Sequence, residues 1–363
     1  MTTLIQNADT LAPHLERWAQ RPWLTIDTEF VRIDTYYPKL CLIQIGDGEQ
    51  AVCVDTLAFD DLDPLLDVLY APNSIKVFHA AAQDLEILVR LRGSCPQPLF
   101  DTQIAATLLG IGDQIGYAGL IDKRLGITLD KSLSRTDWAR RPLREAELAY
   151  AAADVSHLAT IFVSLQDELA ACGRLAWLAE DCARLADASA YVTQPADAWQ
   201  RLRGLARMDA RAQTVAGALA AWRETEAQAR NRPRKWIIED DAIYRMAERL
   251  PDSMAQLEAL GALPPKTLER LGETLLAVIA DARELAPRKL LSDDELTGEQ
   301  KQRLRELQNF VQTRAGELQL PAGYLAPRAD LVEVLRRARA ASVAALSGWR
   351  LQVCGEDLLA RFF

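Results

Sequence analysis

The first part of the chain alternates between strand-like and helix-like spacing of its hydrophobic side chains. Residues 23–31 repeat at every second position, as one face of a strand does, through Leu24, Ile26, Thr28 and Phe30. Further strand-like runs are short and aliphatic, at 40–45, 51–54, 75–78 and 99–100. Helical spacing occurs at 61–69, 81–91 and 102–109. Three early strands followed by strand–helix alternation predict an α/β domain with a mixed sheet.

Beyond residue 144 the pattern is helical throughout. One continuous helix is expected over 144–185, and no strand-like run recurs after Pro195. Shorter helices, separated by Pro and Gly, are expected at 209–229, 240–250, 253–260, 267–284, 297–318 and 329–345. These breaks predict three domains: an α/β domain over residues 1–195, and all-α domains over 200–285 and 290–363.

Composition agrees with several soluble domains. The 363 residues exceed the roughly 250–300 at which a single core stops growing. Uncharged apolar runs fall far short of the ~18 residues of a membrane span, and the first residues do not read as a secretory signal. The six cysteines form no C-x-x-C pair, which argues against zinc and a disulfide scaffold. We therefore expect a cytoplasmic protein without a membrane anchor.

Charge is distributed unevenly along the chain. The net charge is −9, yet residues 1–200 carry −12 and residues 201–250 carry +4. Within the acidic part, residues 123–144 hold seven Lys and Arg against two Asp. This basic stretch is either a solvated surface, as most charge runs are, or a phosphate-facing lip beside an acidic site.

Two carboxylates occupy the polar face of the predicted strand 23–31. Asp27 and Glu29 are two residues apart, so their side chains project from the same face. Asp is depleted in strands, and neighbouring carboxylates repel each other. The pair is explained either by an exposed sheet face or by a bound divalent cation.

Further acidic groups follow. Tyr150 and Asp154 are four apart in a helical stretch and so share a face, while Asp84 lies in the first turn of a predicted helix. His79, at the preceding strand end, is expected to be a structural histidine. Carboxylate oxygens without clustered His or Cys favour Mg²⁺ or Mn²⁺ over Zn²⁺. Two such ions about 3.5–4 Å apart support in-line phosphoryl displacement, which is nuclease chemistry.

Three motifs resemble, in order and spacing, those of the DEDD exonuclease superfamily. They are Asp27-Thr-Glu29, His79-Ala-Ala-Ala-Gln-Asp84 and Tyr150-Ala-Ala-Ala-Asp154, whose tyrosine is typical of the DEDDy branch. The stretches that flank them, 35–45, 100–104 and 134–143, are similar to the bacterial ribonuclease D family. Residues 219–279 resemble the HRDC domain that follows the nuclease in that family, and 290–363 resemble a second one more weakly.

The resemblance implies a ribonuclease H-like mixed sheet followed by two all-α HRDC-like domains. It implies that Asp27, Glu29 and Asp154 hold one divalent ion, Mg²⁺ or Mn²⁺, and that Asp27 bridges to a second near Asp84. Tyr150 would orient the attacking water. The implied activity is 3′→5′ exoribonuclease trimming of RNA with a single-stranded 3′ tail, tRNA precursors among them, with release of nucleoside 5′-monophosphates.

The basic stretch lies between the second and third motifs and gives candidate RNA contacts. We expect phosphate contacts from Arg135, Arg140 and Arg141, and either base stacking or a core role for Trp138. Two alternatives stay open. A DNA exonuclease of the same superfamily would share these motifs, since only contacts to the 2′-hydroxyl separate the two. A nucleic-acid-binding scaffold built on the HRDC region is the other.

Overall fold

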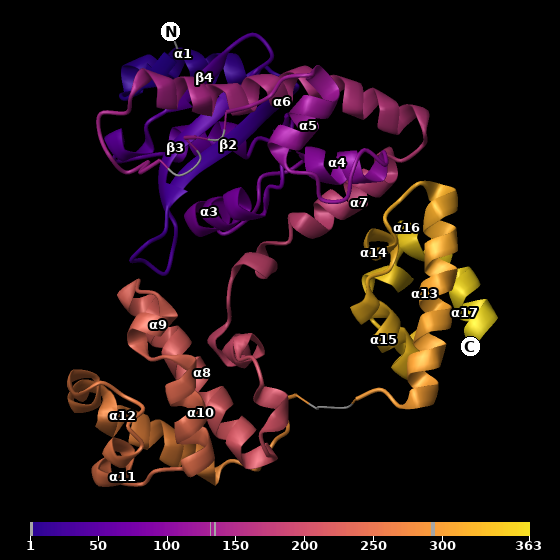
Figure 1. Ribbon diagram of the computed structural model, residues 1–363. Helices are drawn as coiled ribbons and strands as arrows, with labels where there is room; N and C mark the ends of the chain where they lie inside the picture. The colour runs from indigo at the N-terminus through magenta and orange to yellow at the C-terminus, as the bar shows by residue number, and fades with distance from the viewer. Residues whose placement is uncertain (1–2, 131, 134–135, 292–294) are drawn as a thin grey trace. The chain divides into compact units, whose positions relative to one another are not determined.

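The computed structural model describes residues 3–130, 132–133, 136–291 and 295–363. The chain forms two compact units (Figure 1). The first comprises Met1–Val31, Leu40–Tyr191 and Leu296–Phe363, and the second Arg32–Lys39 and Val192–Glu295. The C-terminal helices, expected as a separate domain, thus belong to the same unit as the sheet. The loop after the strand that carries Asp27 and Glu29 belongs to the other unit.

The sheet has six strands in the order β1-β4-β3-β2-β5-β6. They are β1 (Thr3–Ile5), β2 (Trp23–Val31), β3 (Lys39–Gly46), β4 (Ala51–Val54), β5 (Ile75–Phe78) and β6 (Leu99–Asp101). Strands β3 and β4 pair antiparallel, whereas β1–β4, β2–β5 and β5–β6 are parallel. The predicted mixed sheet is confirmed; only the three-residue β1 was not expected.

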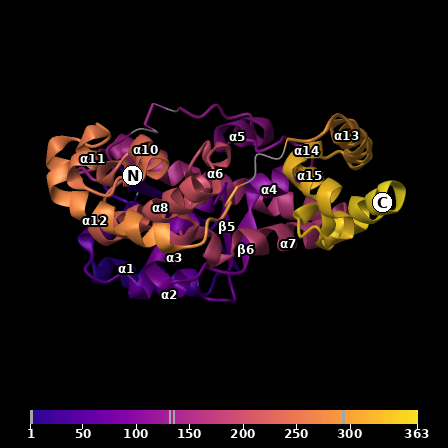
Figure 2. The same cartoon turned by 90° about the horizontal axis from the view of Figure 1, so that it is seen from below.

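One face of the sheet is covered by α1 (Ala8–Ala19), α2 (Asp63–Leu69) and α3 (Ala82–Arg92), which Figure 2 shows together along one side. Leu24 and Ile26 of β2 pack there against Trp18, Leu66 and Leu85. Because successive side chains of a strand point to opposite faces, the odd-numbered residues of β2 face the other side of the sheet. This explains the alternation of side chains along residues 23–31.

The opposite face carries α4 (Thr102–Leu108), α5 (Tyr117–Leu125), α6 (Glu145–Ala171) and α7 (Leu175–Leu185). Helix α6 packs on β2 and β4 and buries Leu148, Ala151 and Val155. The single helix expected over 144–185 is wrong. It breaks at Gly173, whose positive φ of 71° ends α6 and begins the turn into α7.

Helix α6 is also the one helix, among the residues that the structure describes, that is long and apolar enough to cross a membrane by length and composition. In its most apolar window 44% of the residues are buried inside the protein. Its apolar positions pack on the sheet and on α4, α5 and α7. A core helix on a buried sheet face accounts for this composition.

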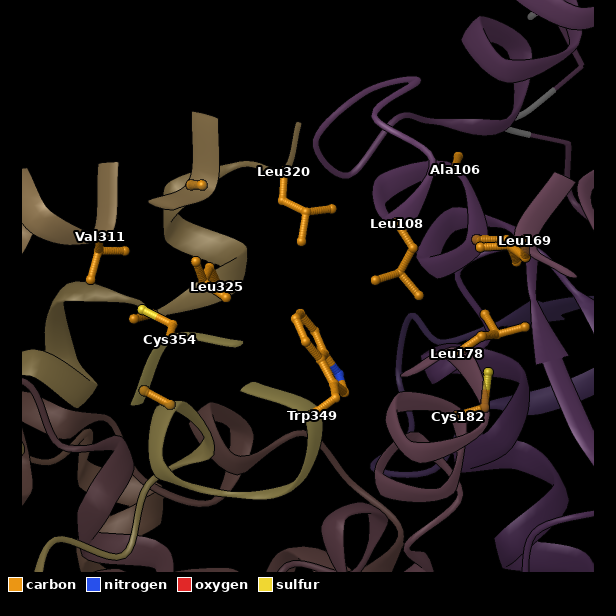
Figure 3. Close-up of a cluster of buried hydrophobic side chains, with 14 of the residues drawn as sticks. Ala106, Leu108, Leu169, Leu178, Cys182, Val311, Leu320, Leu325, Trp349 and Cys354 are labelled. Atoms are coloured by element: carbon orange, nitrogen blue, oxygen red, sulfur yellow. The ribbon is translucent and has the colours of Figure 1, made fainter. Parts of the chain in front are cut away.

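The C-terminal part of the first unit is helical: α13 (Gly298–Leu318), α14 (Ala322–Leu325), α15 (Arg328–Arg337), α16 (Gly348–Arg350) and α17 (Glu356–Phe362). The helix expected over 329–345 stops at Arg337, because Ala338 adopts a positive φ of 48°. Leu320 and Trp349 share one buried cluster with Leu108 and Leu178 of α4 and α7, as Figure 3 shows. The likeness of this part to an HRDC domain stays a prediction.

A buried ion pair fastens these helices to α7. Arg350 donates to both carboxylate oxygens of Asp181, at 2.5 and 3.1 Å, and neither residue is more than 7% exposed. Asp181 also accepts from the Tyr324 hydroxyl at 2.5 Å and from the indole nitrogen of Trp349 at 3.2 Å. The Trp349 ring stacks on Trp177, with centroids 4.5 Å apart. The carboxylate of Asp181 thus organises the contact.

The second unit is built from α8 (Ala210–Arg230), α9 (Arg234–Ile237), α10 (Asp240–Arg249), α11 (Met254–Ala259) and α12 (Pro265–Glu284). Four of these agree with the expected helices to within two residues. The segment Arg32–Lys39 joins them through Tyr36, whose hydroxyl donates to Glu224 of α8. Asn231, at the end of α8, accepts from the backbone N–H groups of Tyr36 and Tyr37 at 3.1 and 3.0 Å.

Removing the carboxylate at position 181 should loosen the first unit. We expect Asp181→Ala to lower the free energy of unfolding by about 3–5 kcal/mol, because Arg350 is left as an uncompensated buried charge. Urea unfolding followed by fluorescence measures the loss. The control is Asp357→Ala, whose side chain is 67% exposed and lies 3.8 Å from Arg314, and which should change stability by less than about 1 kcal/mol. Equal effects of the two substitutions would contradict the assignment.

Candidate active site

Three carboxylates meet between β2 and α6. Asp27 and Glu29 lie on the β2 face opposite Leu24 and Ile26, and Asp154 comes from α6. One oxygen from each lies within 4.8 Å of the others, and all three residues are partly buried. The structure thus brings together residues that are more than a hundred positions apart in the sequence.

The approach of α6 to the sheet is fixed by a hydrogen bond and a missing side chain. The Thr25 hydroxyl donates to the backbone oxygen of Val155 at 2.8 Å. Beside it, residue 46 of β3 is a glycine. A Cβ at this position would collide with the Thr25 hydroxyl and lie 3.1 Å from the Val155 oxygen, so any larger residue would push α6 away from the sheet. Val155 directly follows Asp154, so this contact sets the carboxylate opposite Asp27.

Asp84 lies beside this group and is held separately. It occupies the first turn of α3, is buried, and accepts a hydrogen bond from the Thr28 hydroxyl. Thr28 stands between Asp27 and Glu29 on β2. Burial, and then the charge of Asp27, raise the pKa of Asp84 well above its ordinary value. The fourth expected carboxylate is therefore electrostatically part of the site.

Burial, followed by repulsion between neighbouring carboxylates, raises the pKa values of the acidic side chains in the site. Burial and the charge of Asp154 raise the pKa of Asp27 to about 8, and burial raises the pKa of Asp154 to about 7. Burial, followed by Asp27, Asp154 and Asp84, raises the pKa of Glu29 to about 9. A divalent cation would neutralise this repulsion, and the donors are the hard oxygens that Mg²⁺ and Mn²⁺ prefer. The residues present therefore fit a metal site.

Tyr150 lies one helical turn before Asp154. Its half-buried ring stacks at 26° on Trp138, with centroids 6.4 Å apart. Burial, and then the negative charges of Asp154 and Glu29, raise the pKa of its hydroxyl above the ordinary value. The hydroxyl therefore keeps its proton at neutral pH and is able to donate a hydrogen bond.

Tyr117, which the sequence reading missed, supports the same stretch of α6. Its hydroxyl donates to the backbone oxygens of Asp154 at 2.5 Å and Ala153 at 3.2 Å. Its ring lies edge-on to His79, whose Nδ1 is 3.0 Å from the Thr102 hydroxyl. The expectation of a hydrogen-bonded, structural His79 agrees with this. Tyr117 lies outside the three motifs, so no local pattern could have found it.

The four expected RNA contacts have different environments. Arg135 lies outside the described residues. Trp138 is only 2% exposed and packs with Cys41, Leu143 and Leu148, so its ring takes the core role and is not available to a base.

Arg141 is bound to other parts of the protein. It pairs with Asp55 through two nitrogens and donates to three backbone oxygens. Arg140 pairs with Glu147 while its side chain stays 43% exposed. Of the described members of the set, Arg140 alone presents an accessible guanidinium group.

Comparison with known proteins places this geometry in a family. The 3′-5′ exonuclease family model matches residues 2–170, and the HRDC domain model matches residues 212–279. The chain is 40% identical to the ribonuclease D of Granulibacter bethesdensis over 365 residues, which covers 99% of this chain and 92% of that one. It is 39% identical to the ribonuclease D of Sphingobium indicum, over 98% and 92%.

Among solved structures, the crystal structure of Escherichia coli RNase D, described as an exoribonuclease involved in structured RNA processing, superposes with a TM-score of 0.90. The two sequences are 32% identical, and the match covers 99% of each chain. Shared sequence over nearly the whole length, the same fold and a clustered set of carboxylates agree with one another. The chain therefore belongs to the ribonuclease D family of 3′→5′ exoribonucleases, which are hydrolases of phosphodiester bonds.

Proposed function

We propose that this protein trims the 3′ ends of structured RNA, with tRNA precursors among its substrates, and releases nucleoside 5′-monophosphates in the cytoplasm. The observation that carries the proposal is the group of Asp27, Glu29 and Asp154 within 4.8 Å. Membership of a family that includes an exoribonuclease of structured RNA processing supports the choice of substrate. A single-stranded 3′ tail would supply the end that enters the site.

We further propose that the site holds two divalent ions, Mg²⁺ or Mn²⁺. Asp27, Glu29 and Asp154 would hold one, and Asp27 would bridge to a second near Asp84. When bound, such ions lower the pKa of a water molecule and stabilise the leaving oxygen. The chain itself supplies the Tyr150 hydroxyl, which donates a hydrogen bond that orients the water. Tyr117 and Thr25 hold the α6 backbone on either side of the Asp154 carboxylate.

The two alternatives are less well supported. Carboxylates that hold metal ions and a tyrosine that orients water make no contact specific to the sugar, so they fit DNA equally well. The matched relatives are named ribonucleases, which favours RNA. A pure scaffold has no use for this group of buried carboxylates, because burial and then repulsion from neighbouring carboxylates raise the pKa values of Asp27, Glu29 and Asp84 at a cost in stability.

The first test uses a hairpin RNA with a single-stranded 3′ tail and a DNA of matched sequence in one reaction with Mg²⁺. We expect the RNA tail to be removed first. Asp27→Asn should slow trimming by at least about 10²-fold, the effect of losing one electrostatic group at a reacting centre. Asp67→Asn, at an exposed carboxylate on α2, is the control and should trim normally. Equal trimming by Asp27→Asn and wild type would refute the site, and faster loss of DNA would refute the substrate.

Tyr150→Phe separates orientation of water from substrate binding. Losing the hydroxyl should lower kcat by about 10²-fold, which is the lower end of the range for groups that assist proton transfer. KM should stay nearly unchanged, because the hydroxyl orients the water and does not bind the RNA. Steady-state kinetics on the tailed RNA measure both constants. Tyr70→Phe is the control, since that hydroxyl bonds only to the backbone oxygens of Leu88 and Ser94 in the described contacts. An unchanged kcat would remove Tyr150 from the mechanism.

Metal binding should be visible without any RNA. Mn²⁺ added to metal-free protein should raise the thermal midpoint, by the equivalent of about 2.7 kcal/mol at a hundred times its Kd. Asp154→Asn should lose most of this increase. Because like-charge repulsion is relieved, the same variant should be at least as stable as wild type without metal at pH 8. A Mn²⁺ response identical in the variant and the wild type would exclude this carboxylate from the site.

A further inference from the structure

A pocket of about 410 Å³ lies at the beginning of α6, outside the carboxylate group. Arg140, Arg144 and Glu147 line it, together with Thr136 and Asp137. The two arginine side chains are 43% and 62% exposed, whereas the carboxylate of Glu147 is 1% exposed. The pocket therefore presents two guanidinium groups to solvent and buries the carboxylate of Glu147 beneath them, while the carboxylate of Asp137 is exposed at its edge.

Glu147 holds both arginines in place. It accepts from Arg140 at 2.8 Å through each of its oxygens, and from Nε and Nη2 of Arg144 at 2.9 and 2.8 Å. The backbone N–H of Arg144 adds a further bond at 2.7 Å. Arg140 also donates from Nη1 to the backbone oxygen of Pro142 at 3.1 Å. Each guanidinium group has five N–H donors, so further donors on both arginines stay directed away from Glu147. Arginines fixed in this way bind a phosphate with little loss of side-chain entropy.

The pocket is aligned with the active site along α6. Glu147, Tyr150 and Asp154 are separated by three and four residues and so form one stripe on the helix surface. The seven residues from Glu147 to Asp154 span almost two turns, or about 10 Å of rise. That separation corresponds to one or two nucleotides of a single strand whose 3′ end lies at the carboxylates, because successive phosphates in RNA stand about 6–7 Å apart.

We propose that Arg140 and Arg144, preorganised by Glu147, form a binding site for a backbone phosphate of the RNA, one or two nucleotides upstream of the scissile bond. The inference rests on the proposed function, since it names a contact for the same substrate. Arg140 was expected to contact RNA from its position in the basic stretch. Arg144 and Glu147 are new, and their roles differ: the arginines touch the ligand, and Glu147 positions them.

The experiment measures RNA binding apart from hydrolysis. In an Asp27→Asn background without metal, fluorescence anisotropy gives the Kd of an eight-nucleotide RNA and of a dinucleotide at several salt concentrations. Adding Arg144→Gln should weaken binding of the longer RNA about tenfold and the dinucleotide much less. The slope of log Kd against log salt should fall by about 0.7, the contribution of one phosphate contact on a single strand. Arg305→Gln, at an exposed arginine of α13, is the matched control.

Two further variants separate binding from folding. Arg144→Lys keeps the charge but not the planar fork, so it should restore the salt slope and recover the affinity only in part. Glu147→Gln removes the negative charge that both arginines share, so the dependence of log Kd on log salt should become steeper. The thermal midpoint of this variant checks that the fold is kept. An unchanged Kd and slope in Arg144→Gln would overturn the phosphate site. So would an equal loss for both RNA lengths, which would indicate a structural role. Failure of the wild type to trim RNA would instead refute the proposed function.

Discussion

The arrangement of the catalytic half depends on how closely α6 approaches β2 and β3. The Thr25–Val155 hydrogen bond and the bare Cα of Gly46 bring the helix backbone onto the sheet at the residue that follows Asp154. Carboxylates repel one another at this distance, so their proximity is sustained by packing elsewhere on the helix, through Leu148, Ala151 and Val155. Small side chains in the third motif are thus a steric requirement of the carboxylate group, because a larger residue at Ala151 would hold α6 away from the sheet.

Local periodicity placed the acidic side chains on shared faces, the family resemblance supplied their expected chemistry, and neither revealed the contacts that support them. The two-residue alternation of β2 separates Asp27 and Glu29 from Leu24 and Ile26, and the four-residue spacing of α6 pairs Tyr150 with Asp154. The Tyr117 hydroxyl and the Thr25–Val155 bond depend on contacts across long sequence separations, which no local pattern encodes. The break at Gly173 was missed because the Ala-rich residues on both sides favour helix strongly, and only the positive φ of the glycine marks the end.

The basic stretch shows why a charge run cannot be interpreted by itself. Arg124 pairs with Glu168 of α6, Arg141 with Asp55 beyond β4, and Lys123 donates to the Ile111 backbone oxygen. Each of these cations is engaged by a group distant in sequence. Arg140 and Arg144 differ, because both pair with the same carboxylate, that of Glu147. The role of a basic side chain therefore depends on its partners in the fold: those three are held by the protein, and a phosphate contact stays a proposal for Arg140 and Arg144.

The interlaced division of the chain has a consequence for its synthesis. The unit that contains Met1–Val31 also contains Leu296–Phe363, and most of the other unit, Val192–Glu295, lies between them in the sequence. A nascent chain therefore emerges from the ribosome with α7 complete while Trp349 and Arg350, the partners of Trp177 and Asp181, are still to be made. Until the final helices arrive, an indole ring and a carboxylate stand exposed to water and to other proteins. The first unit thus becomes complete only after the second unit has been synthesised.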